Sequence, residues 1–276
     1  MTKLYFFGSD QYSDTVLTYL RDHSDFSITH FSDLKSFTNG GMVQWSNDAI
    51  PIGLCASFPH LFPSELISVF DGRLYNLHPS LLPQYRNVAP VPYAIALGDT
   101  QTGITLQRID EKIDHGEIIA HIKEPILPGD TTPTLLHRLF AMGAELFLNY
   151  LDNSSPTPNY ELPSTPLVFT RKLNSQSGFV EWPVMLKLID NQPLTPEDTA
   201  NPLIDLRLTH HPERQHNILP DLIRALSGYE KVWTTAPTSK GDLRISFVYT
   251  PGGEIRVLIP GKPRPITWAD FQKYYL

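Results

Sequence analysis

The sequence predicts an α/β domain with a mostly parallel sheet, followed by a smaller β-rich domain. Short apolar, β-prone runs alternate with stretches of helical periodicity through the N-terminal half. A stretch without apolar periodicity, rich in proline, serine and threonine, then interrupts the chain at residues 152–170. Beyond it, closely spaced β-prone runs are separated by glycine and proline turns. We therefore expect one domain at residues 1–151, a linker at 152–170 and a second domain at 171–276.

The first strand and helix of the α/β pattern are read from residues near the N-terminus. Residues 4–7 form an apolar run that ends at Gly8, and Val16, Leu17 and Leu20 then recur at helical spacing. The pattern continues with strands at 26–31, 50–58 and 73–77, helices at 63–70 and 91–97, paired strands at 103–109 and 117–125, and a closing helix at 135–151. Alternating strands and helices are typical of a parallel sheet.

After the linker, the pattern changes. A polar stretch at 171–182 precedes a helix at 219–226 and strands at 231–236, 243–249 and 255–259. Short, closely spaced strands with glycine and proline turns indicate a small β-barrel or sandwich.

Composition excludes several protein classes. Hydrophobic residues make up 41% of the 276 residues and charged residues 18%, which is typical of a folded globular chain. No apolar run reaches the ~18 residues of a membrane span, and the first residues lack the pattern of a secretory leader. The single cysteine, Cys55, excludes an internal disulfide and a cysteine-based zinc site. A reducing, cytoplasmic compartment fits best, and we expect no metal.

Charge is distributed unevenly along the chain. Residues 1–170 carry 9 basic and 18 acidic side chains, whereas residues 171–276 carry 13 and 11. The net charge of −7 argues against binding of nucleic acid by bulk electrostatics. The second half could contact a polyanion, although its net charge of +2 favours the interpretation as a neutral surface.

The densest polar constellation follows the strand expected at 73–77. Asn76 and His78 are two residues apart, so on a strand both side chains project from the same face, at the sheet edge where α/β proteins bind ligands. An acidic cluster at 110–117 includes Asp114, whose carboxylate could orient the imidazole. The alternative is structural: His78 is a satisfied histidine at a strand end, and Asp114 begins a turn before Gly116.

Three other motifs carry weaker signals. Gly8-Ser9-Asp10 lacks the three-glycine spacing of a dinucleotide site. Ser80 lacks the Gly-x-Ser-x-Gly elbow of a nucleophile and is expected to shape its loop. His210, His211 and His216 lack a matching carboxylate or cysteine pattern, so we expect them on a solvated surface.

The segment around Asn76 and His78, together with three further segments, resembles the formyltransferases that use 10-formyltetrahydrofolate, and the methionyl-tRNA formyltransferases most of all. The similar segments are Asn76-x-His78-x-Ser80-Leu81-Leu82-Pro83, Tyr85-Arg86-Asn87-Val88-Ala89-Pro90, Gly98-Asp99-x-x-Thr102-Gly103-Ile104-Thr105 and Asp114-x-Gly116. Weaker similarities continue past the linker in Arg171-Lys172-Leu173, Val180-Glu181-Trp182, Ile223-Arg224-Ala225 and the segment from Pro260 to Phe271.

The resemblance implies a Rossmann-like formyltransferase domain joined to a small β-barrel-like (OB-like) domain. An amine would attack the formyl carbon, and Asn76 and His78 would donate to the oxygen that becomes negative. Asp114 would hold His78 protonated or accept a proton through water. No metal or covalent nucleophile is needed.

The resemblance also implies binding residues and partners. For the folate it points to Phe58, Pro59, Leu61, Ser80, Leu81, Leu82, Pro83, Asp110 and Gly116, although Phe58 and Phe62 are also typical core residues. For the acceptor it points to Arg86, Asn87, Arg171, Lys172 and Arg224. The implied partner is initiator methionyl-tRNA, in translation initiation, with the chain acting as a cytoplasmic monomer.

Three features depart from the family and leave three functions open. The family has a long basic insertion where residues 31–42 of this chain carry one lysine, Lys35. Asn87 stands where glycine is usual in the family, so we expect the loop after Arg86 to turn differently. The second domain is also short. The chain therefore formylates methionyl-tRNA, formylates a small amine such as an amino-sugar nucleotide or amino-ribonucleotide, or is a silent folate-binding relative.

Overall fold

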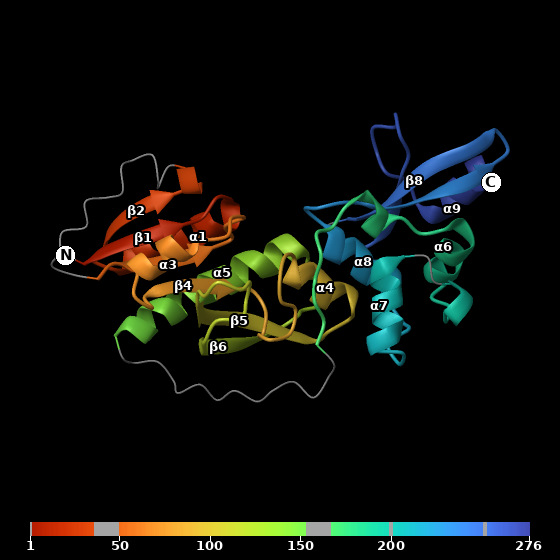
Figure 1. Ribbon diagram of the computed structural model, residues 1–276. Helices are drawn as coiled ribbons and strands as arrows, with labels where there is room; N and C mark the ends of the chain where they lie inside the picture. Colours follow the sequence, from red (N-terminus) through yellow and green to blue (C-terminus); the bar gives the residue numbers. More distant parts are fainter. Residues whose placement is uncertain (1, 36–49, 153–166, 199–200, 251–252) are drawn as a thin grey trace. The chain divides into compact units, whose positions relative to one another are not determined.

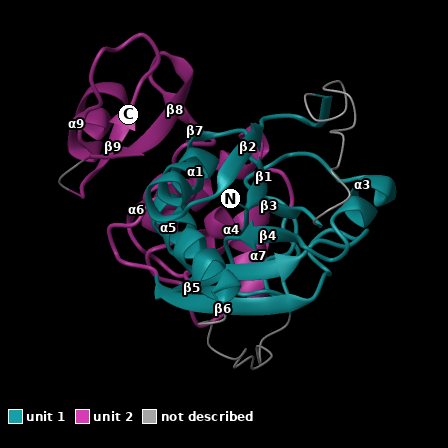
Figure 2. Ribbon diagram, turned by 90° about the vertical axis from the view of Figure 1, so that its left-hand side faces the viewer, with its two compact units in different colours: residues 1–90, 101–125, 135–170 teal, residues 91–100, 126–134, 171–276 magenta. Residues whose placement is uncertain are grey.

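The computed structural model describes residues 2–35, 50–152, 167–198, 201–250 and 253–276 (Figure 1). The chain divides into two compact units (Figure 2). Unit 1 comprises residues 1–90, 101–125 and 135–170, and unit 2 comprises residues 91–100, 126–134 and 171–276. Most of the expected linker, 153–166, and residues 36–42 of the lysine-poor segment lie outside the described residues. The predicted domain boundaries stay predictions.

Unit 1 contains a six-stranded mixed sheet, as expected from the alternating pattern. Its strands are β1 (Lys3–Phe7), β2 (Ser27–Phe31), β3 (Ile52–Ala56), β4 (Leu74–His78), β5 (Gln101–Arg108) and β6 (Ile118–Pro125), in the order β2-β1-β3-β4-β5-β6. The first four strands pair in parallel, whereas β4–β5 and β5–β6 are antiparallel. The mostly parallel sheet and the terminal strand pair are both confirmed.

The helices that follow these strands have local sequence causes. Helix α1 (Gln11–His23) begins at Asp10, whose carboxylate accepts from the amides of Tyr12 and Ser13 at 3.0 and 2.9 Å. Such a cap stabilises a helix by about 1 kcal/mol, so Gly8-Ser9-Asp10 is explained as a helix start. The other helices of the N-terminal half are α3 (Ser64–Val69), α4 (Pro90–Ala96) and α5 (Thr132–Leu151).

The two faces of the sheet have different roles. On one face, Leu66 and Phe70 pack on a buried cluster formed by Tyr5, Phe7, Phe31, Cys55 and Leu74. On the other, Gly143 of α5 lies so close to Ile104 and Leu77 that an added Cβ would be 3.0 and 3.2 Å from them. Registered neighbours share a face, so Asn76 and His78 lie on the face of the aromatic cluster.

Unit 2 combines short helices with a three-stranded antiparallel sheet. The strands β7 (Val232–Thr238), β8 (Gly241–Tyr249) and β9 (Ile255–Leu258) pair in that order, and single bridges join Phe179 to Trp233 and Val257 to Ile266. This arrangement is consistent with a small barrel-like domain. The helical elements are η1 (Ser175–Gly178), α6 (Trp182–Ile189), η2 (Pro196–Asp198), α7 (Pro202–His210), α8 (Ile218–Leu226) and α9 (Trp268–Tyr275). Among the described helices, none has the length and apolar character needed to cross a bilayer.

Candidate active site

The candidate site is built on β4 and its antiparallel neighbour β5. Asn76 lies opposite Gln107, and His78 lies opposite Thr105, so four polar side chains share one face of the sheet. Thr105 positions the loop after β4, because its hydroxyl donates to the Ser80 carbonyl at 2.6 Å and accepts from the Leu82 amide at 3.2 Å. The predicted common face of Asn76 and His78 is confirmed by this register.

His78 and Asp114 form a buried pair. The His78 Nδ1 atom is 3.4 Å from Asp114 Oδ1, and the two side chains are only 6% and 9% exposed. His78 Nε2 is 2.9 Å from the Tyr85 carbonyl oxygen. Both ring nitrogens therefore face oxygen acceptors, an arrangement that accommodates both protons of an imidazolium. The Asn76 side chain is half-buried and makes no hydrogen bond to the described residues. Its amide can therefore donate to a ligand.

Asp114 is held by three groups. Besides His78, its carboxylate accepts from Gln107 Nε2 at 2.8 Å and from the Asn87 amide at 2.9 Å. Asp114 has a φ of +53°, and an added Cβ on nearby Gly116 would lie 1.8 Å from the Arg108 carbonyl oxygen. Only glycine fits at that position without backbone movement. The Asp-x-Gly spacing thus has a steric reason.

Gln107 was not predicted from the sequence. Its side chain is almost fully buried, and its Oε1 atom has no hydrogen-bond partner among the described residues. Since the carboxylate of Asp114 can only accept, the amide nitrogen of Gln107 must face it and the oxygen must face away. The register of β5 against β6 shifts between Leu106 and Gln107, the kind of irregularity that re-aims a side chain. The position of Gln107 depends on the antiparallel pairing with Asn76, for which sequence spacing carries no signal.

The loop after β4 has an unusual backbone. Tyr85, Asn87 and Ala89 have φ values of +60°, +78° and +64°. The left-handed region favours glycine and is also tolerated by asparagine. Asn87 therefore occupies a conformation that glycine adopts readily, and its presence does not require the different turn that we expected. This conformation lets the Asn87 amide reach Asp114.

Burial of the site also affects Cys55. The thiol lies on β3 next to Asn76 in the registered sheet and is fully buried. Burial, together with the negative charge of Asp114, raises the pKa of the Cys55 thiol. The raised pKa favours the protonated form of the thiol.

The predicted folate residues fall into buried and exposed groups. Ser80 is fully buried and its hydroxyl donates to the Gln84 carbonyl at 2.7 Å, so it shapes the loop. Phe58 and Phe62 stack on each other with centroids 5.6 Å apart and pack partly buried against Phe7, so both belong to the core edge. Leu82 is buried, with a cis bond to Pro83; Leu81 and Gly116 are half-buried; and Pro59, Leu61 and Asp110 are exposed.

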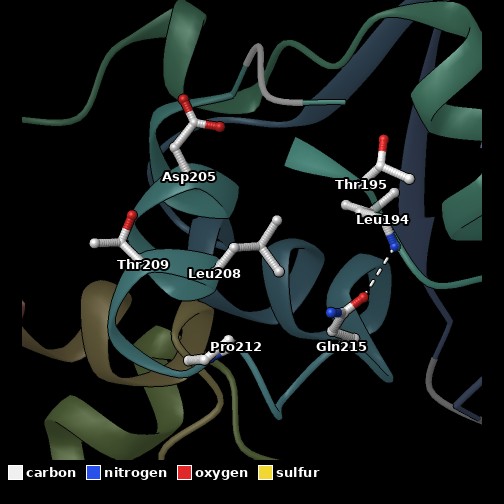
Figure 3. Close-up of a pocket in the computed structure, with 7 residues that line it drawn as sticks. All are labelled: Leu194, Thr195, Asp205, Leu208, Thr209, Pro212 and Gln215. Atoms are coloured by element: carbon white, nitrogen blue, oxygen red, sulfur yellow. Dashed lines mark hydrogen bonds between the residues drawn. The ribbon is translucent and has the colours of Figure 1, made fainter. Parts of the chain in front are cut away.

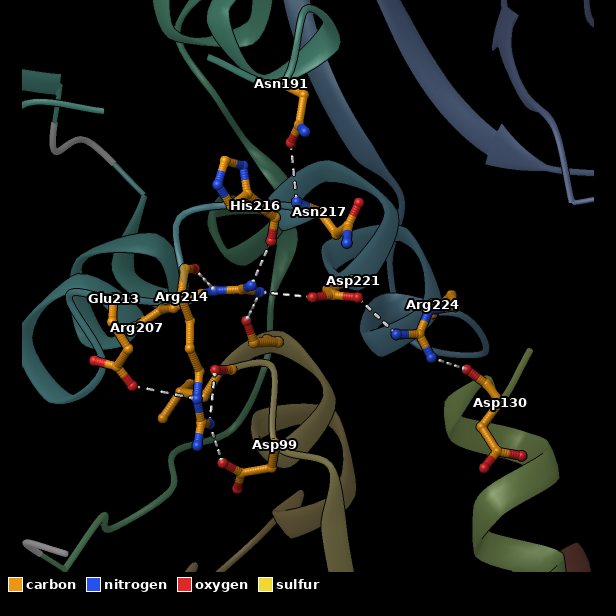
Figure 4. A network of polar contacts seen from close by, with 12 residues as sticks. Asp99, Asp130, Asn191, Arg207, Glu213, Arg214, His216, Asn217, Asp221 and Arg224 are labelled. Atoms are coloured by element: carbon orange, nitrogen blue, oxygen red, sulfur yellow. Dashed lines mark hydrogen bonds and ion pairs between the residues drawn. The ribbon is translucent and has the colours of Figure 1, made fainter. Parts of the chain in front are cut away.

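The predicted acceptor residues divide in the same way. Arg86 is half-buried, with a terminal nitrogen 3.4 Å from His115 Nε2. Arg171 and Lys172 are exposed. Arg224 is buried instead, which corrects its predicted role in acceptor binding. It donates to Asp221 at 2.6 Å and to the Asp130 carbonyl at 2.7 Å, so it is not available to a ligand (Figure 4).

Arg224 belongs to a polar network within unit 2. Arg207 is also buried and pairs with the other carboxylate oxygen of Asp221 at 2.7 Å (Figure 4). Arg214 contacts Asp99 at 2.5 Å. His211, which we expected on a solvated surface, is buried between Asp99 and Glu213 at 3.8 and 3.5 Å; burial, and secondarily Arg214, lowers its pKa.

Other candidate sites are less developed. No group of three or more histidine, cysteine, aspartate or glutamate side chains suited to a metal occurs in the described part of the chain. A pocket beside α7 is lined by Leu194, Thr195, Asp205, Leu208, Thr209, Pro212 and Gln215 (Figure 3). Burial raises the pKa of Asp205 there, but none of the predicted site residues lines this pocket.

Known proteins resemble this chain in sequence and in fold. Residues 44–151 match a family model described as formyl transferase. Methionyl-tRNA formyltransferases from Buchnera aphidicola and Corynebacterium diphtheriae are 34% and 33% identical over 131 and 150 residues, which is 47% and 54% of this chain and 42% and 47% of theirs. The aligned region thus spans less than half the length of these curated relatives.

The fold has solved counterparts over nearly the whole chain. A methionyl-tRNA formyltransferase from Clostridium thermocellum matches 97% of this chain and 100% of its own, with a TM-score of 0.62 and 14% identity. A Mycobacterium tuberculosis protein considered a sugar N-formyltransferase matches 95% and 100%, with a TM-score of 0.56 and 18% identity. At these identities the likeness concerns the fold. The match of residues 44–151 to the formyl transferase model, in contrast, includes all four site residues on β4, β5 and the following turn.

Proposed function

We propose that this chain transfers a formyl group from 10-formyltetrahydrofolate to the amino group of methionyl-tRNA. The observation that carries the proposal is the buried His78–Asp114 pair on the same sheet face as Asn76, whose side-chain amide has no hydrogen-bond partner among the described residues. The family match of residues 44–151 and the names of the similar relatives support the reaction class and the acceptor.

The folate supplies a formyl carbon bound to nitrogen. In the transfer, the amine nitrogen bonds to that carbon and the carbon–folate nitrogen bond breaks, while one proton leaves the amine and one reaches the folate nitrogen. The Asn76 amide donates to the formyl oxygen as it gains negative charge, a contact worth ~10²–10³ in rate at comparable sites. Asp114 receives the amine proton directly or through water. Because both ring nitrogens of His78 face protein oxygens, we assign it the support of the Asp114 carboxylate at 3.4 Å in place of the expected donation to the formyl oxygen.

The chain offers groups that suit a folate. Phe58 and Phe62 form an aromatic pair at the core edge, on the face of the sheet that also carries Asn76 and His78. Exposed Pro59 and Leu61 and half-buried Leu81 extend this apolar surface. A pterin ring requires such an apolar wall together with polar backbone groups. We include Asp110 and Gly116 because they flank Asp114 in the same turn.

The acceptor side of the proposal rests on three cations. Arg86 is half-buried and lies beside His115, while Arg171 and Lys172 are exposed at the start of the C-terminal segment. These three side chains are suited to phosphate contacts. Because aminoacyl-tRNA is used where proteins are synthesised, the proposal includes a cytoplasmic location.

A small-amine acceptor is the second candidate. Residues 31–42 contain one lysine, and residues 1–170 carry twice as many acidic as basic side chains. Such a surface disfavours a long polyanion and tolerates a compact substrate with one or two phosphates.

The test is formyl transfer to charged initiator methionyl-tRNA by the purified chain, with His78→Ala as the blank. The matched control is His23→Ala, which removes an exposed imidazole from the last turn of α1 in the same unit. Turnover in wild type and in His23→Ala, but not in His78→Ala, supports the proposal. Turnover only with amino-sugar nucleotides or amino-ribonucleotides supports the second candidate, and folate binding without any turnover contradicts both.

A further inference from the structure

Residues 167–170 pair with the loop that follows β4. The Tyr85 amide donates to the Val168 carbonyl at 3.0 Å, and the Val168 amide donates to Gln84 Oε1 at 2.9 Å. The Thr170 amide donates to the Arg86 carbonyl at 3.0 Å. A strand-like bridge between Arg86 and Phe169 completes the contact. We call residues 167–170 the strap; it lies wholly within unit 1.

The loop bound by the strap supplies partners to both members of the buried pair. The Tyr85 carbonyl accepts from His78, and the Asn87 amide donates to Asp114. Both residues are left-handed, as is Ala89. Non-glycine residues in that region are disfavoured and persist where their surroundings fix them. The strap provides such surroundings, since it binds the loop on either side of Asn87.

Thr170 is central to this contact. Its side chain is buried, and its hydroxyl lies 2.9 Å from the Arg86 carbonyl oxygen and also contacts that of Val88. The Asn87 amide side chain donates to the Thr170 carbonyl at 3.4 Å. One hydroxyl thus closes the backbone turn from Arg86 to Val88, which contains the amide that reaches Asp114.

We propose that Thr170 is a positioning residue for the His78–Asp114 pair. It acts through the loop and touches neither side chain, and its catalytic consequence rests on the proposed function. Loss of the hydroxyl frees the Val88 carbonyl, leaves the Arg86 carbonyl with the Thr170 amide alone and relaxes the left-handed turn, so Tyr85 and Asn87 no longer hold their partners in one geometry. Misplacement of a catalytic group by about 1 Å lowers turnover by ~10²-fold.

The test compares Thr170→Val, Thr170→Ser and a matched control, Thr132→Val. Valine keeps the shape and removes the hydroxyl, whereas serine keeps the hydroxyl. Thr132 is fully buried and donates to the Ala225 carbonyl at 2.6 Å within unit 2, so its valine variant loses a similar bond away from the strap.

The primary readout is the imidazole ¹⁵N spectrum of the full chain, with His78 identified by its loss in His78→Gln. We expect the His78 signals to shift or split in Thr170→Val, to be restored in Thr170→Ser and to stay in place in Thr132→Val. We also expect kcat to fall by ~10²-fold in Thr170→Val with little change in KM. Unchanged His78 signals in Thr170→Val would overturn the proposal. Moved signals in a chain without any turnover would retain the positioning role of Thr170 and refute the proposed function.

Discussion

Replacing Gln107 with methionine separates stability from activity at the site. Methionine has nearly the same length and volume, so the substitution leaves little cavity. It removes two features at once: the hydrogen bond from Nε2 to Asp114 at 2.8 Å and the buried, unpartnered Oε1 atom. Gln107 is 2% exposed, so water replaces neither.

The two effects on stability oppose each other. A hydrogen bond to a charged group contributes about 1.5–3 kcal/mol, and a buried unsatisfied acceptor costs about 1–3 kcal/mol. The two ranges overlap, so the net loss of stability is at most about 2 kcal/mol, and each kcal/mol shifts the Tm of a chain of this size by roughly 2–4 °C. Turnover responds differently, because Asp114 keeps only His78 and Asn87 as partners. We expect kcat to fall by ~10²-fold if the carboxylate moves by about 1 Å.

The assay is formyl transfer measured beside thermal unfolding, with Leu106→Met as the matched control. Leu106 is the preceding residue of β5, fully buried on the opposite face of the strand, so this control tests methionine in the same strand without touching Asp114. Wild-type turnover in Gln107→Met would refute the positioning argument. A loss of more than about 3 kcal/mol would instead show that Oε1 has a partner and that Gln107 is a structural residue.

Three further substitutions test the surroundings. Gly116→Ala places a Cβ 1.8 Å from the Arg108 carbonyl, so we expect about 1–3 kcal/mol of destabilisation in a denaturant titration and loss of activity. Arg224→Met leaves Asp221 with one fewer cation and should cost about 3–5 kcal/mol of stability; an unchanged stability with weaker tRNA binding would restore Arg224 to the acceptor site. Burial lowers the pKa of His211 from 6.5, so the unfolded chain binds its proton at higher pH than the folded one. The stability that neutral His211 contributes is therefore complete above about pH 6.5 and is lost as the pH falls through the folded pKa. In a plot of denaturation midpoint against pH, we expect His211→Gln to reduce the fall of the midpoint below pH 6.5.

Most of the fold follows from local patterns. Strands β1 and β3 are apolar runs, and α1 begins at the capping side chain of Asp10, so their positions are readable from short windows. Helix α7 was missed for a physical reason. It buries Arg207 together with Leu203 and Ile204, and a helix that buries a cation shows no clean apolar stripe.

The site was predictable only where geometry is local. Asn76 and His78 share a face because they are two residues apart on one strand. Gln107 depends on the antiparallel register and on the irregularity next to Leu106, neither of which is visible in sequence spacing. The strap depends on contacts between residues more than 80 positions apart.

Burial also changes how the charge of the C-terminal half is interpreted. Residues 171–276 contain 13 basic and 11 acidic side chains, but Arg207, Arg224 and Asp221 form a buried network. The side chains that remain outside this network are thus closer to neutral than the sequence total indicates. Each phosphate contact by a cation changes the logarithm of affinity by about 0.7–0.9 per tenfold change in salt. Phosphate contacts by Arg86, Arg171 and Lys172 would give a slope of about 2–3 on that scale, so recognition of a tRNA acceptor would depend mainly on contacts other than phosphate neutralisation.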